Sequence, residues 1–94
     1  MQVKKLTKTF PLGHQVMTHN AKENIPTPDM FAALNRHATC DWGEVCAEDW
    51  NRNNEAVEYG DRLLSVYTAS NNIRFWIITE WNRSVTTILL PQDY

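Results

Sequence analysis

Apolar and polar residues alternate with a helical period in the middle of the chain. Thr27 and Pro28 predict a helix start, because threonine can cap free backbone amides and proline fits the first helical turn. The apolar positions that follow recur every three or four residues and predict an amphipathic helix to about Ala38. These positions are Met30, Phe31, Leu34 and His37.

A second helix is predicted from roughly Glu44 to Tyr59, after a break at residues 40–43. One stripe of this helix carries its apolar positions together with one asparagine: Val45, Cys46, Trp50, Asn53 and Val57. Gly60 follows it at the position where a glycine in the left-handed conformation commonly ends a helix.

After the second helix the period changes from about 3.6 residues to about two, which is the period of a strand. Strands are predicted over 62–69, 73–80 and 85–90, with turns at 70–72 and 81–84. Because such short turns cannot make the long crossover that parallel pairing needs, we expect an antiparallel three-stranded meander.

The N-terminal part is predicted to add a strand over 14–18 and a loop over 20–28, which is polar and contains two prolines. Residues 3–9 are a further candidate strand. The predicted fold is α+β in the order β-α-α-β-β-β. Its two helices pack on one face of a C-terminal antiparallel three-stranded meander plus an N-terminal strand.

The 94 residues are expected to form one domain, 1–94, because neither half could enclose a core of its own. No apolar run reaches the roughly eighteen residues of a membrane-spanning helix, and no apolar signal core follows the first lysines. We therefore expect a cytoplasmic protein with no membrane segment, in which Cys40 and Cys46 are reduced thiols.

The net charge of −2 is small but unevenly distributed. Three lysines fall within the first ten residues. Between Asp41 and Asp61 there are seven carboxylates against Arg52 alone, a local charge of −6. A basic nucleic-acid-binding surface is therefore not expected in the middle of the chain.

Three residues carry the donor atoms of a zinc site, His37, Cys40 and Cys46, but their spacing matches no established ligand pattern. A nucleophilic cysteine–histidine pair would need a nearby cation, whereas the neighbouring residues are carboxylates. An acid–base site of His37, Glu44 and Arg83 is a third alternative. We expect no catalytic residue, no metal and no cofactor.

The last turn, Glu80-Trp81-Asn82-Arg83-Ser84, is a candidate for protein binding. A tryptophan at the tip of a tight turn is poorly placed for burial, and tryptophan and arginine dominate the hot spots of protein interfaces. The alternative is that Trp81 folds over the sheet edge while Glu80 and Arg83 form a minor surface pair.

The acidic second helix extends this candidate surface through Glu48, Asp49 and Glu55. A charged outer face is usually only solvated. Beside an exposed tryptophan, however, an acidic helix face can bind in a basic groove of a partner protein. Its carboxylates then take the place of nucleic-acid phosphates.

A structural role is expected for the residues that form turns or caps: Asp41, Trp42, Gly43 and Gly60. Trp42 is predicted to fill the gap where the helices meet the sheet, and Asp41 or Glu44 to cap the second helix. The alternative is a recognition patch in which these carboxylates join Glu48 and Asp49.

Much of the chain resembles a family of small "plasmid-related" proteins of bacterial plasmids and integrated elements, sometimes labelled restriction-modification subunits. The resemblance covers residues 12–94. The residues that carry it are Arg36-His37, Asp41-Trp42-Gly43-Glu44, Cys46, Glu48-Asp49, Asn54, Gly60, Arg62-Leu63-Leu64-Ser65, Tyr67, Trp76-Ile77-Ile78-Thr79-Glu80, Asn82-Arg83-Ser84, Thr86-Thr87, Leu90-Pro91 and Tyr94. The chain departs from the family at residues 19–28, at Cys40, where glycine is more usual, and at Trp81. The resemblance implies a mobile-element setting and no activity.

We therefore expect a non-enzymatic protein-binding module of a bacterial mobile element, which modulates or counters a host defence system through its acidic, tryptophan-containing surface. One alternative is a small nucleic-acid-associated regulator that uses Lys4, Lys5, Lys8 and the sheet. A second is a small hydrolase or metal-dependent enzyme.

Overall fold

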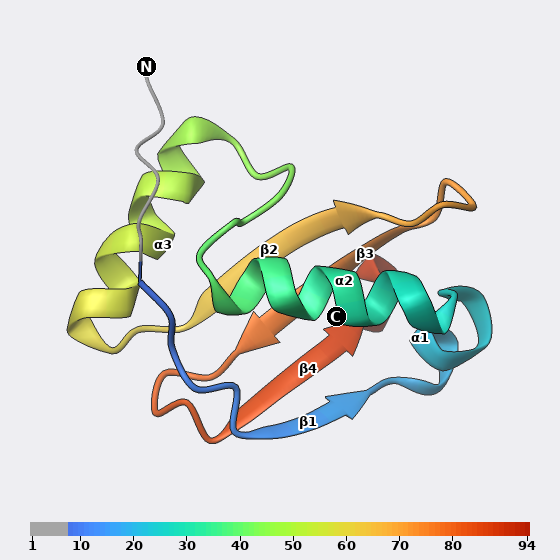
Figure 1. Cartoon of the computed structure of the whole chain (residues 1–94), viewed down its shortest axis with the longest axis horizontal. Coiled ribbons are helices and arrows are strands. Elements are labelled where there is room, and N and C mark those ends of the chain that lie inside the picture. The colour runs from blue at the N-terminus through green and yellow to red at the C-terminus, as the bar shows by residue number, and fades with distance from the viewer. Residues whose placement is uncertain (1–7) are drawn as a thin grey trace.

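A computed structural model describes residues 8–94 as two layers, helices on a sheet (Figure 1). The predicted α+β class is confirmed. In chain order the elements are β1 (His14–Met17), α1 (His19–Asn24), α2 (Thr27–Ala38), α3 (Ala47–Tyr59), β2 (Leu63–Thr68), β3 (Arg74–Thr79), β4 (Val85–Leu89) and the short 3₁₀ helix η1 (Pro91–Asp93).

The sheet has four strands in the order β1-β4-β3-β2. β2, β3 and β4 form the predicted antiparallel meander, with Ser65 opposite Ile77 and Ile77 opposite Ile88. β1 pairs in parallel with β4, so the sheet is mixed rather than purely antiparallel. The intervening helices and strands supply the long crossover that a parallel pair requires.

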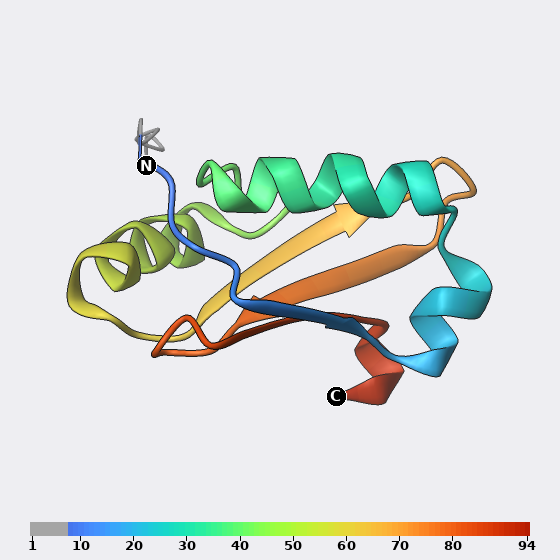
Figure 2. The same ribbon diagram turned by 60° about the horizontal axis from the view of Figure 1, so that its bottom comes forward.

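Figure 2 shows α2 and α3 on one side of the sheet and η1 on the other. β2 shows why: Leu63, Ser65 and Tyr67 are buried beneath the helices, and the residues between them are partly exposed. A period of two in burial is expected for a sheet that is covered on one face.

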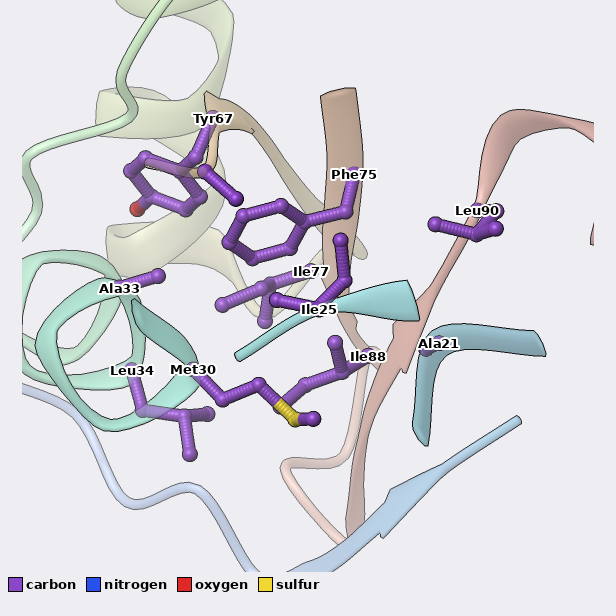
Figure 3. Close-up of a cluster of buried hydrophobic side chains, with 11 residues drawn as sticks. Ala21, Ile25, Met30, Ala33, Leu34, Tyr67, Phe75, Ile77, Ile88 and Leu90 are labelled. Atoms are coloured by element: carbon purple, nitrogen blue, oxygen red, sulfur yellow. The ribbon is translucent and has the colours of Figure 1, made fainter. Parts of the chain in front are cut away.

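Two hydrophobic clusters hold the layers together. One packs α1 and α2 on the sheet and is drawn in Figure 3; its largest members include Met30, Tyr67, Phe75 and Ile77. The other lies under α3 and contains Phe10, Cys40, Trp42, Trp50, Ala56 and Leu63. Such burial supplies most of the favourable free energy of folding.

The predicted loop at 20–28 is wrong in its first half, because α1 occupies His19–Asn24. The Thr18 side chain accepts a hydrogen bond from the backbone N–H of Ala21 at 3.1 Å and thereby caps the helix. Ala21 and Ile25 are buried in the core. A six-residue polar helix with one buried side chain, Ala21, has too weak a periodicity to be recognised in the sequence.

The predicted helix ends need two corrections. Pro26 precedes α2 as its N-cap residue, so Thr27 is the first helical residue and makes no side-chain cap. α3 begins at Ala47 rather than Glu44, because Gly43 forms a bridge with Val66 of β2. Gly60 ends α3 in the left-handed conformation, with φ 80°, as predicted. The candidate strand at 3–9 lies largely outside the described residues.

We predict that Gly43→Ala is much more destabilising than Gly60→Ala, although both glycines have positive φ. A Cβ on Gly43 would lie 2.0 Å from the carbonyl oxygen of Val66, whereas one on Gly60 would meet nothing closer than 3.8 Å. Urea unfolding should show a loss of about 3 kcal/mol or more for Gly43→Ala and about 1–2 kcal/mol for Gly60→Ala. Equal losses would contradict the described packing of residues 42–44 against β2.

Candidate functional site

The most deeply buried ionisable side chain, His37, lies between α2 and the sheet. Its Nδ1 is 2.5 Å from the hydroxyl of Ser65 on β2, and its Nε2 is 2.9 Å from the hydroxyl of Thr79 on β3. The Thr79 hydroxyl in turn lies 2.7 Å from that of Thr86 on β4. Thr86 completes the series by donating to the backbone carbonyl of Leu12 at 2.7 Å.

The Leu12 carbonyl determines the direction of every hydrogen bond in this series, because it can only accept. The Thr86 hydroxyl has one proton and donates it to that carbonyl, so it can only accept from the Thr79 hydroxyl. Thr79 must then accept from His37, which makes Nε2 the protonated nitrogen. The series thus requires a proton on Nε2 of His37. In the neutral ring, Nδ1 is then unprotonated and accepts from Ser65.

Electrostatics favour the same neutral form. Burial lowers the pKa of His37 from 6.5 to about 3, and the positive charge of Arg83 adds to the effect. The ring also makes edge contacts with Phe10 and Trp42, at centroid distances of 5.2 and 5.5 Å. A histidine with both nitrogens engaged and no exposed surface is a structural group.

The predicted chemical alternatives at His37 are not assembled. The thiol of Cys40 is buried and donates to the carbonyl of Lys8, whereas Cys46 is exposed at the start of α3. Glu44 pairs with Arg74, 3.3 Å apart. Within residues 8–94 no three histidine, cysteine or acidic side chains come together as metal ligands.

Four of the seven carboxylates in the acidic segment 41–61 form ion pairs, two of them with cations that are distant in sequence. Arg36 binds Asp41 at 2.8 Å, Arg74 binds Glu44, and Lys8 binds Glu58. Arg52 lies 3.5 Å from Asp49 within α3 itself. The expected stripe of free negative charge on α3 is therefore reduced, and Glu48 and Glu55 remain as its exposed carboxylates without an ion pair among the described residues.

The residues of the last turn divide into buried and exposed groups. Arg83 binds inward: its guanidinium donates to the carbonyls of Ala56 at 2.8 Å and Asp61 at 2.6 Å. It therefore caps the C-terminus of α3, where the helix dipole favours a cation. Trp81 is 65% exposed, as expected for the turn tip, and Glu80 lies 3.7 Å from Arg62.

The segment between the two longer helices is structural. Trp42 is fully buried, stacks on Phe10, and donates from its indole nitrogen to Asn54 at 2.9 Å. Asp41 accepts from the backbone N–H of Gly43, which makes a local turn. Neither Asp41 nor Glu44 caps α3, contrary to expectation, because the helix starts at Ala47 with no side-chain cap.

Cys40 shows why glycine suits this segment. Its φ is 66°, in the left-handed region that a residue with a Cβ adopts only at a cost. The position follows the C-cap residue of α2, Thr39, where a glycine would adopt this backbone conformation without that cost.

The face of the sheet opposite the helices is unusually apolar. Residues directly paired across strands point to the same side, so the registers place on this helix-free face His14, Val16, Leu64, Val66, Thr68, Arg74, Trp76, Ile78, Val85, Thr87 and Leu89. An antiparallel sheet that faces water on one side normally has polar residues there. Figure 2 shows the short helix η1 on this side.

Two aromatic residues and one arginine form a cluster on the helix-free face. Tyr94 contacts Trp76 edge to face at a centroid distance of 5.5 Å. The guanidinium of Arg62 lies over the Tyr94 ring, 5.3 Å from its centroid, and donates to its hydroxyl at 2.9 Å. Tyr94 is 69% exposed. We call these three residues the aromatic–arginine cluster.

The cluster borders a shallow hollow of about 200 Å³ in which both signs of charge occur. Its lining includes Arg62, Glu80, Asp93 and Tyr94 over a floor of Ile78, Thr87 and Leu89. Asp93 accepts hydrogen bonds from Thr18 at 2.6 Å and Asn20 at 2.7 Å. These bonds hold the pKa of Asp93 below its usual range and attach η1 to the start of α1.

No family model, curated protein or solved structure matches this chain. Function must therefore be inferred from the fold and from the chemistry of the surface. Of the predicted protein-binding residues, Trp81, Glu80, Glu48 and Glu55 lie at the surface, Asp49 is paired within α3, and Arg83 is engaged internally. The aromatic–arginine cluster was missed, although the alternation of Leu64, Val66, Trp76 and Ile78 was visible as a second apolar face.

We predict that acid destabilises the protein through His37. The pKa of His37 in the folded state lies below 6.5. Between these two pKa values, His37 is therefore protonated in the unfolded chain and neutral in the folded protein. The stabilising contribution is complete above pH 6.5 and is lost as the pH falls toward 3, by about 2 kcal/mol between pH 7 and pH 5. Urea unfolding of His37→Gln should lack this loss, and His19→Gln, at an exposed histidine, should retain it. An unchanged pH dependence in His37→Gln would contradict the assignment.

We also predict that Arg83 contributes to stability as a helix cap. Arg83→Ala removes the side-chain donor of the Asp61 carbonyl and one of the three donors of the Ala56 carbonyl, which still accepts from the backbone N–H groups of Gly60 and Asp61. It should lower the free energy of unfolding by about 1–2 kcal/mol. Arg52→Ala removes only an exposed ion pair and should change it by less than about 1 kcal/mol. Thermal or urea unfolding of the two variants makes the comparison, and equal effects would refute the cap.

Proposed function

We propose that this protein is a non-enzymatic protein-binding module whose main contact surface is the aromatic–arginine cluster on the helix-free face. The supporting observation is the exposure of Tyr94 beside Trp76 and Arg62 on an apolar sheet face. Tyrosine, tryptophan and arginine are the residues most enriched in interface hot spots. An apolar patch with a polar rim is the usual form of such a site.

The charges around the cluster favour a folded protein as the partner. Arg62 stands beside Glu80 and Asp93, and Arg74 lies at the opposite end of β3. A rim of both signs suits a partner surface with complementary charges of both signs. Trp81, at the turn after β3, and the exposed carboxylates Glu48 and Glu55 are secondary contact candidates.

The resemblance to small mobile-element proteins suggests where such a module acts. A binding protein without a catalytic group can alter a host system only by occupying a surface of one of its components. We therefore propose that the partner is a component of a bacterial defence system.

A nucleic-acid-associated role is the second candidate function. Two aromatic rings with Arg62 and Arg74 on an open sheet face could stack bases, as sheet-based single-strand binders do. The carboxylates of Glu80 and Asp93 in the same hollow oppose this role, because they repel phosphates. A mobility shift with single-stranded oligonucleotides at low salt, lost on salt addition, would favour nucleic acid over protein.

We predict that Tyr94→Ala abolishes partner binding and Tyr59→Ala does not. Both residues are exposed tyrosines, but Tyr59 lies on α3, 82% exposed, away from the cluster. In affinity capture from a bacterial lysate, the proteins retained by the wild type should also be retained by Tyr59→Ala and be lost with Tyr94→Ala. Trp81→Ala tests the turn separately.

Three results would weigh against the proposal. Capture of the same proteins by Tyr94→Ala would exclude the cluster as the contact surface. Loss with Trp81→Ala alone would transfer the site to the turn. Loss with Tyr59→Ala would place the site on α3. Circular dichroism of each variant must match the wild type before binding is compared.

A further inference from the structure

We propose that the open edge of β1 binds an extended peptide as an additional strand, with the peptide's apolar side chains in the groove between β1 and α2 and its carboxylate on Lys22. This site is separate from the aromatic–arginine cluster and does not depend on the function proposed above.

Within residues 8–94, no other strand pairs with the outer edge of β1. The N–H groups of His14 and Thr18 both donate to the β4 side, to Ser84 at 2.8 Å and to Ile88 at 2.9 Å. Backbone groups of a strand point to alternate sides, so those of Gln15 and Met17 point away from β4. β1 is the terminal strand of the sheet, so these groups are available to a partner.

The opposite edge of the sheet is closed. The backbone N–H of Glu44 donates to the carbonyl of Val66 at 2.7 Å, and the N–H of Val66 donates to that of Trp42 at 3.2 Å. The segment at 42–44 therefore covers the edge of β2. β1 has no equivalent cover among residues 8–94, and it contains neither lysine nor proline, which commonly protect exposed edges.

An apolar groove of about 200 Å³ runs beside this edge. Its lining comes from β1, α1, α2 and β4 and includes Met17, Met30, Phe31, Leu34 and Ile88. Phe31 is 64% exposed and Met17 is 49% exposed, so two of the large exposed apolar side chains meet at one groove. Met17 is opposite Ile88 in the register and points to the helix side of the sheet.

The geometry of a strand then defines the ligand. A peptide paired with Gln15 and Met17 would direct every second side chain to the helix side, over the groove. Those positions favour apolar residues. Main-chain hydrogen bonds would supply affinity and the groove would supply selectivity, as in other cases of strand addition.

The positive charge of Lys22 in the groove favours a peptide that carries a carboxylate. Lys22 is the charged residue of the groove lining, is exposed, and forms no ion pair within the described part of the chain. A carboxylate on the peptide would complement it. A second copy of β1 could not supply one, because residues 8–19 contain no aspartate or glutamate. The groove therefore fits a foreign acidic, apolar peptide better than another copy of this chain.

The probe is an acetylated, amidated hexapeptide of alternating valine and threonine that ends in aspartate, titrated into ¹⁵N-labelled protein. The backbone amides of Gln15 and Met17 should shift and become protected from exchange, and those of β2 should not. Phe31→Ala should weaken binding about tenfold, and Tyr59→Ala should leave it unchanged. A peptide methylated on alternate backbone nitrogens should not bind, because it cannot form the ladder.

A charge swap isolates the contribution of Lys22. The wild type should bind the aspartate peptide about threefold more tightly than a lysine counterpart, and Lys22→Glu should reverse that preference. The proposal is overturned if no peptide shifts Gln15 and Met17 at millimolar concentration, or if the methylated peptide binds equally well. Shifts of these amides with protein concentration alone would assign the edge to a second copy and would also overturn it.

Discussion

One buried side chain, His37, joins the two layers of this protein. Through four successive hydrogen bonds it connects α2 to β2, β3 and β4 and to the segment that precedes β1. A polar group in a core destabilises a fold unless it is fully hydrogen-bonded. Here that condition is met, and no buried side-chain nitrogen or oxygen in the described region lacks a partner.

The same hydrogen bonds give His37 a structural role, and the function that we propose lies at the surface. Both ring nitrogens are engaged, and burial keeps the ring neutral. We propose two different contact regions: the aromatic–arginine cluster on the helix-free face and the groove beside the outer edge of β1. The first is proposed for a folded partner and the second for an extended peptide, so the two proposals can be tested separately.

Local patterns predicted much of the fold. The meander followed from the period of two and the short turns, and Gly60 marked the end of α3. The parallel pairing of β1 with β4 could not be predicted, because partners more than sixty residues apart leave no local pattern. The local charge of the acidic segment was overestimated for the same reason: Arg74 and Lys8 pair with Glu44 and Glu58 through contacts that only the fold creates. Arg83 resembled an interface residue in sequence but caps α3.

The most direct test of this account is the protonation state of the His37 ring, measured by ¹H–¹⁵N correlation spectroscopy of the imidazole nitrogens at pH 5. The account predicts one protonated nitrogen, Nε2, with Nδ1 unprotonated and a slowly exchanging ring N–H. A proton on Nδ1 alone would contradict the hydrogen-bonded series, and a doubly protonated ring would contradict the burial that keeps His37 neutral.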